Sequence, residues 1–193
     1  MTTRPIVGAE PAMDVPVLFN FLGSLVLLGV AIYVLNRESR VDDRLGAGAN
    51  VKVKQGASVL RRFGARFLDF LPFGIVYQAL AVGFDFGLVL PVLYVVVLYA
   101  YFVLADAYAG TTLGKRLLSL RVVGPSGDKP EIKQAATREA VIIVSALLGA
   151  VPFAGDLLGS IPWLVIAWTI ANSPTKQGQH DQIAGGTRVI KVS

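Results

Sequence analysis

Long apolar runs constrain this chain more than any other feature of its sequence. Residues 17–35 form a stretch of 19 residues without a single charged side chain. A helix of that length measures about 28 Å, which is close to the hydrocarbon thickness of a bilayer. The preceding residues carry Glu10 and Asp14 against Arg4, so they lack the basic start of a signal peptide. We therefore expect a retained transmembrane helix over residues 17–35, preceded by an extracytoplasmic segment at residues 1–16.

Further apolar segments follow a basic linker at residues 36–56. The segment at residues 63–84 is interrupted by Asp69 and Pro72, which predicts a kinked helix that faces protein as well as lipid. Residues 88–105 are uncharged and long enough to return across the membrane. These two segments supply the second and third predicted spans.

A fourth apolar block, residues 140–171, is too long for one helix and contains turn residues at 151–156. The block predicts a helical hairpin with arms of about 15 residues, or about 22 Å, shorter than the ~30 Å core of a bilayer. Either the bilayer is thinned at the hairpin or the hairpin is re-entrant. The fold class expected is an all-α polytopic membrane protein of about five helical segments, with residues 57–193 as its main membrane domain.

The distribution of Lys and Arg predicts the topology. One side of the predicted bundle receives most of the cations: Arg37, Arg40, Arg44, Lys52, Lys54, Arg61, Arg62, Lys115, Arg116, Arg121, Lys129, Lys133, Arg138, Lys176, Arg188 and Lys191. Among the Lys and Arg residues, the opposite side of the predicted bundle holds Arg4 alone. The positive-inside rule then predicts a multi-pass plasma-membrane protein with its N-terminus outside and its C-terminus in the cytoplasm. The net charge of +5 is thus explained by topology and indicates no nucleic-acid partner.

Two segments on the cytoplasmic side have β-strand character. Residues 117–123 are rich in β-branched and apolar side chains, and residues 124–130 are a dense turn signal. Residues 187–192 alternate between polar and apolar side chains. These patterns predict a small antiparallel sheet beside the membrane.

Three ionisable side chains stand at the start of the second span. Arg62, Arg66 and Asp69 are spaced so that they lie close to one face of a helix. A charge in hydrocarbon costs from about 2.5 kcal/mol upward, so such residues face protein, pair with one another or serve function. The arginines can reach water with their long stems, whereas the shorter Asp69 needs a partner. One interpretation is an ion pair that orients helices, and the other is a site for a proton, cation or polar solute.

Residues 110–115 have the sequence Gly-Thr-Thr-Leu-Gly-Lys, which invites comparison with a phosphate-binding loop. Such a loop needs four residues between its glycines and a Ser or Thr after the Lys, but here there are three, and Arg116 follows. We therefore expect no nucleotide. The segment instead predicts a tight turn at the membrane interface, with its last lysine at the lipid headgroups. We assign Gly110, Thr112, Gly114 and Lys115, together with the distant His180, to one interfacial motif.

His180, the only histidine, adjoins Asp181. One histidine and one carboxylate are too few groups for a metal site or a hydrolase triad. We expect His180 to be a hydrogen-bonding residue at the interface, and the alternative is a proton relay, because its unperturbed pKa is about 6.5. The chain has no cysteine, which excludes disulfides and cysteine-based catalysis. We therefore expect neither an enzyme nor a cofactor.

Three separated motifs occur in a fixed order along the chain. They are Arg62-x-x-Ala65-x-x-x-Asp69, Gly110-x-Thr112-x-Gly114-Lys115, and Gln179-His180-Asp181 with Ala184-Gly-Gly-Thr187. Together they resemble the RDD family of membrane proteins, named for one arginine and two aspartates. By motif position the resemblance implies that these residues are Arg62, Asp69 and Asp181, and it covers residues 56–192. The first apolar helix lies outside it, and one additional glycine precedes Thr187.

The resemblance links the charged stripe to the distant Asp181. Asp106 closes the third span near the same predicted boundary. We therefore predict one charge cluster at the cytoplasmic end of the bundle, formed by Arg62, Arg66, Asp69, Asp106 and Asp181.

Two functions fit this predicted cluster. The first is transport of an ion, a proton or sodium, or of a small polar solute, which the family resemblance also implies. The second is a non-catalytic scaffold or assembly factor, in which the charges fix helix packing and the first helix and basic loops bind a partner. Both functions imply the lipid bilayer as a partner. The sequence leaves open whether the chain also forms a homo-oligomer or binds a partner in a membrane complex.

Overall fold

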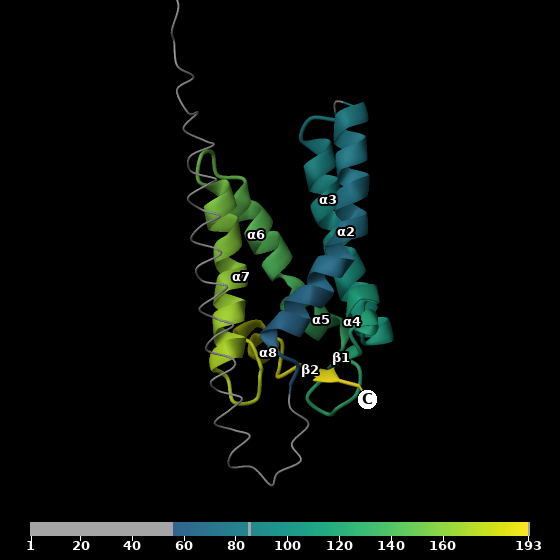
Figure 1. Ribbon diagram of the computed structural model, residues 1–193, viewed down its shortest axis with the longest axis vertical. Coiled ribbons are helices and arrows are strands. Elements are labelled where there is room, and N and C mark those ends of the chain that lie inside the picture. The colour runs from purple at the N-terminus through teal and green to yellow at the C-terminus, as the bar shows by residue number, and fades with distance from the viewer. Residues whose placement is uncertain (1–55, 85, 193) are drawn as a thin grey trace, which may run out of the picture.

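The computed structural model describes residues 56–84 and 86–192 of the chain. The predicted segment at residues 1–16, the predicted helix at 17–35 and the linker before Gly56 lie outside these residues. In Figure 1 the described part consists of two long helical hairpins that diverge upward from a common base of short helices and strands. Helix α2 (Val59–Gly83) and helix α3 (Val89–Leu104) form the first hairpin.

Helices α2 and α3 supply the two helices of the described chain that are long and apolar enough to cross a membrane, Val59–Gly83 and Val89–Ala109. Ser58 caps α2, because its hydroxyl accepts a hydrogen bond from the backbone N–H of Arg61 at 3.3 Å. Pro72 lies inside α2, and Figure 1 shows the lower part of the helix tilted against its upper part. A proline removes one helical hydrogen bond, so the kink predicted from the sequence has a local cause.

The candidate span Val89–Ala109 ends in an irregular turn. Its last residues form a π-helix, η1 (Ala105–Ala109), which ends at Gly110 with a φ of 67°. A π-helix is rare and often occurs at functional sites. Here it carries the fully buried Asp106.

Helices α6 (Val141–Gly149) and α7 (Gly155–Asn172) form the second hairpin, as predicted, but its arms are unequal. Equal arms of about 15 residues were expected, whereas α6 has 9 residues and α7 has 18. The difference arises because a separate helix, α5 (Ile132–Glu139), ends just before this block, so only a short stretch remains for α6 before the turn that begins at Ala150. At 1.5 Å per residue α6 is about 13 Å long, well short of a bilayer core.

The arms of this second hairpin touch at small residues. A Cβ atom added to Gly155 would lie 2.0 Å from the carbonyl oxygen of Gly149, and one added to Gly159 would lie 2.9 Å from that of Ser145. Glycine therefore permits the backbones to approach closely. The spacing of Gly155 and Gly159 serves a contact within the hairpin.

The common base contains the short elements. They are α4 (Leu113–Leu117), β1 (Leu120–Val123), α5 (Ile132–Glu139), α8 (Gln179–Ile183) and β2 (Arg188–Lys191). The strands pair antiparallel, with Leu120 opposite Lys191 and Val123 opposite Arg188, which confirms the predicted small sheet. Gly56 bridges to Ile190, so the start of the described chain joins the same sheet.

An apolar core connects the two hairpins where they converge. Phe102 of α3 and Ile170 of α7 are almost completely buried in it. Phe70 of α2 packs edge-on against both Phe102 and Trp163, with ring centroids 5.6 and 6.3 Å apart. Toward the far ends the helices expose apolar side chains such as Val82, which is 88% exposed. The apolar outer surfaces and the polar interior at the base suit a protein embedded in lipid.

Candidate functional site

Arg62 lies in the first turn of α2 and is almost fully buried. Its Nε–H donates to the carbonyl of Ala57 at 3.0 Å, and its Nη1 donates to Asp181 Oδ2 at 2.6 Å. Its Nη2 donates to the carbonyl of Lys176. The guanidinium thereby connects the start of α2 to the segment that leads into α8, 119 positions further along the chain.

Asp181 stands at the centre of the site. It is fully buried and accepts a second charged hydrogen bond from Arg138 Nε at 2.9 Å. The backbone N–H of Gly178 also donates to it, at 3.1 Å. Burial alone would raise the pKa of Asp181, but Arg138 and Arg62 outweigh it and hold the pKa well below its usual range. Asp181 is therefore an anion at neutral pH.

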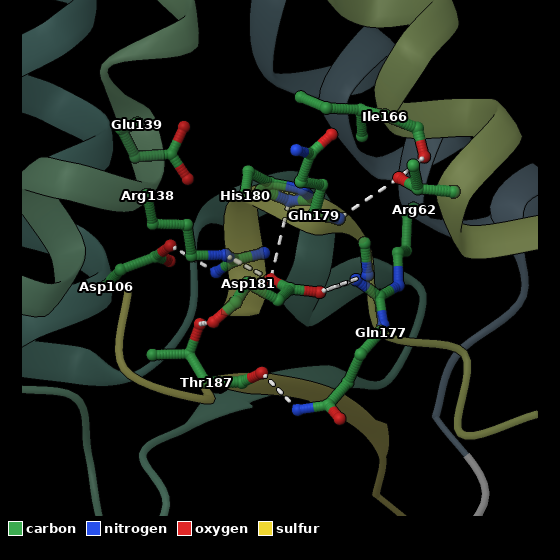
Figure 2. Close-up of polar contacts among 12 residues, drawn as sticks. Arg62, Asp106, Arg138, Glu139, Ile166, Gln177, Gln179, His180, Asp181 and Thr187 are labelled. Carbon is green, nitrogen blue, oxygen red and sulfur yellow. Dashed lines mark hydrogen bonds and ion pairs between the residues drawn. The ribbon is translucent and has the colours of Figure 1, made fainter. Parts of the chain in front are cut away.

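Arg138 joins this carboxylate to a second one. Figure 2 shows Arg138 between Asp106 and Asp181, with Arg62 on the other side of Asp181. Arg138 Nη1 lies 2.9 Å from Asp106 Oδ2, and Lys115 Nζ lies 2.6 and 2.7 Å from the two Asp106 oxygens. Although burial opposes its charge, the neighbouring carboxylates raise the pKa of Arg138 above its ordinary value.

A further ion pair adjoins this chain of contacts. Arg66 Nη1 lies 2.7 Å from Glu139 Oε2, and the Arg66 guanidinium stacks 4.0 Å from the centroid of the Phe102 ring. Burial would raise the pKa of Glu139, but Arg66, Lys115 and Arg138 together hold it well below its usual range. We use the term ion-pair cluster for the four cations and three carboxylates Arg62, Arg66, Lys115, Arg138, Asp106, Glu139 and Asp181.

Asp69 is bound differently from the other predicted residues. Its oxygens accept hydrogen bonds from the Tyr101 hydroxyl at 2.9 Å, the Thr112 hydroxyl at 2.5 Å and the Gly114 backbone N–H at 2.7 Å. Within the described residues no Lys, Arg or His lies within salt-bridge distance of it. Asp69 therefore anchors the turn that begins α4 through neutral donors.

The predicted charge cluster is thus brought together in part. The structure places Arg62, Arg66, Asp106 and Asp181 in one cluster, whereas Asp69 joins the interfacial motif. The arginines do not extend to water as expected, because carboxylates from other elements meet them inside the protein. The expectation that the Lys115 side chain is exposed at the membrane interface is also wrong: it is 5% exposed and paired with Asp106.

Sequence reasoning missed Arg138 and Glu139. Both are buried members of the ion-pair cluster and end helix α5. The available signal was their position, immediately before the apolar block that starts at Ala140. Charged residues next to an apolar segment need partners inside the protein, as Asp69 does, because a charge in hydrocarbon is costly.

A small cavity of about 30 Å³ lies beside the cluster and is lined by Arg62, Arg66, Lys115, Arg138 and His180 among others. This volume suffices for a buried water. His180 Nε2 faces Asp181 Oδ1 at 3.4 Å, and its buried Nδ1 has no hydrogen-bond partner in the described structure. Burial lowers the pKa of His180 to about 4, against the raising effect of Asp181. The neutral imidazole therefore offers a lone pair to a water.

The additional glycine after α8 leaves the hydrogen bond between Thr187 and Asp181 intact. Gly185 and Gly186 adopt φ values of 82° and 87°, which favour glycine. Thr187 remains fully buried, and its hydroxyl donates to the carbonyl of Asp181 at 3.3 Å. Among the residues that the structure describes, no group of three His, Cys, Asp or Glu side chains could hold a metal ion.

Apolar helices around a buried ion-pair cluster define a class of helical membrane protein, and the two candidate spans fit that class. A model of the RDD family matches residues 56–185, about two thirds of the chain. The chain therefore belongs to the RDD family, as its motifs predict. Searches of curated proteins and of solved structures found no match.

Proposed function

We propose that this chain is a multi-pass protein of the plasma membrane that acts as a non-catalytic scaffold or assembly factor. Its N-terminus lies outside and its C-terminus in the cytoplasm, in accord with the distribution of Lys and Arg. The segment at residues 17–35 provides an apolar surface for a partner in the same bilayer. The charges in the interior hold the helices in one arrangement.

Pairing of each buried carboxylate of the cluster with a cation is the observation that carries this proposal. Asp106, Glu139 and Asp181 each have a cationic nitrogen within 3 Å, at 2.6 to 2.9 Å. Breaking a buried ion pair by removing one partner costs about 3–5 kcal/mol, so an arriving solute would have to replace strong internal contacts. The cavity beside the cluster, about 30 Å³, has room for water but not for a polar solute. These features favour a structural role for the charges.

Ion transport is the second candidate, and the same cavity favours it. A water in this cavity would adjoin the imidazole of His180, a side chain of the kind used in proton relays. Against this, the low pKa of His180, about 4, keeps the imidazole neutral over the physiological range. Transport would also need two alternating gates, for which a small bundle offers little material unless it oligomerises.

Flux measurement separates the two candidates. The full chain is reconstituted in proteoliposomes under a pH or sodium gradient, beside an Asp69→Asn variant and an Asp128→Asn control. Asp128 is exposed, and its carboxylate accepts a hydrogen bond from the nearby Ser126 hydroxyl at 3.3 Å. A scaffold gives no flux above empty liposomes, and Asp69→Asn loses a co-purifying membrane partner because its amide meets N–H and O–H donors. Flux that Asp69→Asn abolishes, while the variant still inserts, would overturn the scaffold proposal.

A further inference from the structure

A second charged pocket is lined in part by helix α4, through the residue that follows the buried Lys115 of the ion-pair cluster. It has a volume of about 560 Å³ and includes Arg116, Arg121 and Lys129 in its lining. Ala109 also lines it, and this residue ends the second candidate span. The pocket therefore lies where the chain leaves that span.

The three cations of this basic pocket are not neutralised. In the described structure no carboxylate lies within 4 Å of Arg116, Arg121 or Lys129, in contrast to the cations of the ion-pair cluster. Lys129 Nζ donates to the carbonyl of Tyr108 at 2.9 Å, which holds the ammonium at the end of the span. Three like charges around one hollow create a positive potential that attracts an anion.

Exposed apolar side chains lie next in sequence to residues of the pocket or on the same short helix. Leu113 and Leu117, on the same short helix as Arg116, are 64% and 73% exposed. Tyr108, whose carbonyl holds Lys129, is 69% exposed. A ligand that contacts both the cations and the exposed apolar side chains would carry an anionic group and a hydrocarbon chain.

We propose that this basic pocket binds the phosphate group of an anionic phospholipid. The two guanidinium groups can each present paired N–H donors to phosphate oxygens, and the lysine adds a third charge. Ser119, which lines the pocket with a φ of 55°, supplies a hydroxyl donor. The acyl chains then lie against the exposed Leu113 and Leu117. This site is separate from the ion-pair cluster and does not depend on the proposed scaffold role.

Lipid binding to the detergent-purified full chain tests the proposal by native mass spectrometry. The probes are phosphatidylglycerol, phosphatidylcholine and glycerol phosphate. The test variant is Arg116→Gln, Arg121→Gln and Lys129→Gln combined. The matched control removes the same charge from exposed cations that do not line the pocket, through Arg61→Gln, Lys133→Gln and Arg188→Gln. Because all six side chains are exposed, both variants should fold, which circular dichroism checks.

The wild-type protein should bind phosphatidylglycerol about tenfold or more tightly than phosphatidylcholine. Since each cation near a membrane contributes about a fivefold factor, the test variant should lose about a hundredfold in affinity and the control about threefold or less. Unchanged affinity in the test variant would overturn the proposal, as would an equal loss in both variants. Glycerol phosphate that binds as tightly as the lipid would identify a soluble phosphate as the ligand and overturn the lipid assignment.

Discussion

Neighbouring residues of one helix face have quite different partners in this protein. Arg62 pairs with Asp181 of α8, Arg66 pairs with Glu139 of α5, and Asp69 binds the turn before α4. Each successive turn of α2 therefore meets another element. The helical spacing was enough to predict that the three side chains share a face. It could not predict their side-chain partners, which lie between 32 positions away, for Asp69 with Tyr101, and 119 positions away, for Arg62 with Asp181.

The single histidine gives stability a defined pH dependence. The pKa of His180 is lowered to about 4 in the folded protein, so the unfolded chain binds more protons than the folded one between about pH 6.5 and 4. Stability is therefore complete above pH 6.5 and falls by about 3 kcal/mol as the pH drops to 4. Thermal unfolding in detergent across this range should show the loss.

The variant His180→Gln provides the control for this prediction. It keeps a polar side chain but removes the titrating group, so its unfolding temperature should be nearly constant between pH 6.5 and 5. An equally steep loss in the variant would assign the dependence to other groups. Asp181 and Glu139, whose pKa values lie below their usual ranges, destabilise the fold only below about pH 5, where unfolded carboxyl groups begin to bind protons. The comparison is therefore made between pH 6.5 and 5.

At the scale of elements, the contact between α2 and α4 is the tightest around the predicted motifs. A Cβ atom at Gly114 would lie 2.0 Å from the carbonyl oxygen of Ala65 and 3.0 Å from the carboxyl carbon of Asp69. The glycine therefore lets α4 rest on the backbone of α2 while its N–H reaches the Asp69 carboxylate. The motif is a packing device between helices.

Gly114→Ala should destabilise the protein by about 3 kcal/mol or more, because the clash is with backbone atoms and also displaces a buried hydrogen bond. The matched control is Gly74→Ala in α2, where an added Cβ meets nothing within 4 Å. That change should be neutral or stabilise by about 0.5–1 kcal/mol. Thermal unfolding of both variants in detergent checks the prediction, and similar stability of the two would contradict it.

The elements differ in how well the sequence predicts them. The 88–105 segment, the hairpin in residues 140–171 and the small sheet follow from apolar runs and alternation, and each is present in the described structure. The short helices α4 and α5 do not follow, since five to eight residues carry too little periodicity. Those helices supply Lys115, Arg138 and Glu139 to the ion-pair cluster. Because the helices could not be predicted, the place of these three side chains in the cluster could not be predicted either.

At the scale of the whole molecule, Asp181 joins three distant parts of the chain. It binds Arg62 of α2 and Arg138 of α5 from its own place in α8. Asp181→Asn leaves two buried guanidinium groups without their shared counter-charge. The variant should lose about 3–5 kcal/mol of stability, measured by thermal unfolding in detergent. Asp128→Asn, at an exposed carboxylate, should change stability by less than about 0.5 kcal/mol, and equal effects in both variants would contradict the prediction.

The distance in sequence between Arg62 and Asp181, 119 positions, has a consequence for biosynthesis. Ribosomes release α2 well before α8, so during synthesis Arg62 enters the nascent protein before Asp181 does, whereas Arg138 follows its other partner, Asp106. A buried charge without its partner is disfavoured. The base of the described fold around Arg62 therefore reaches its neutralised form only after α8 is synthesised.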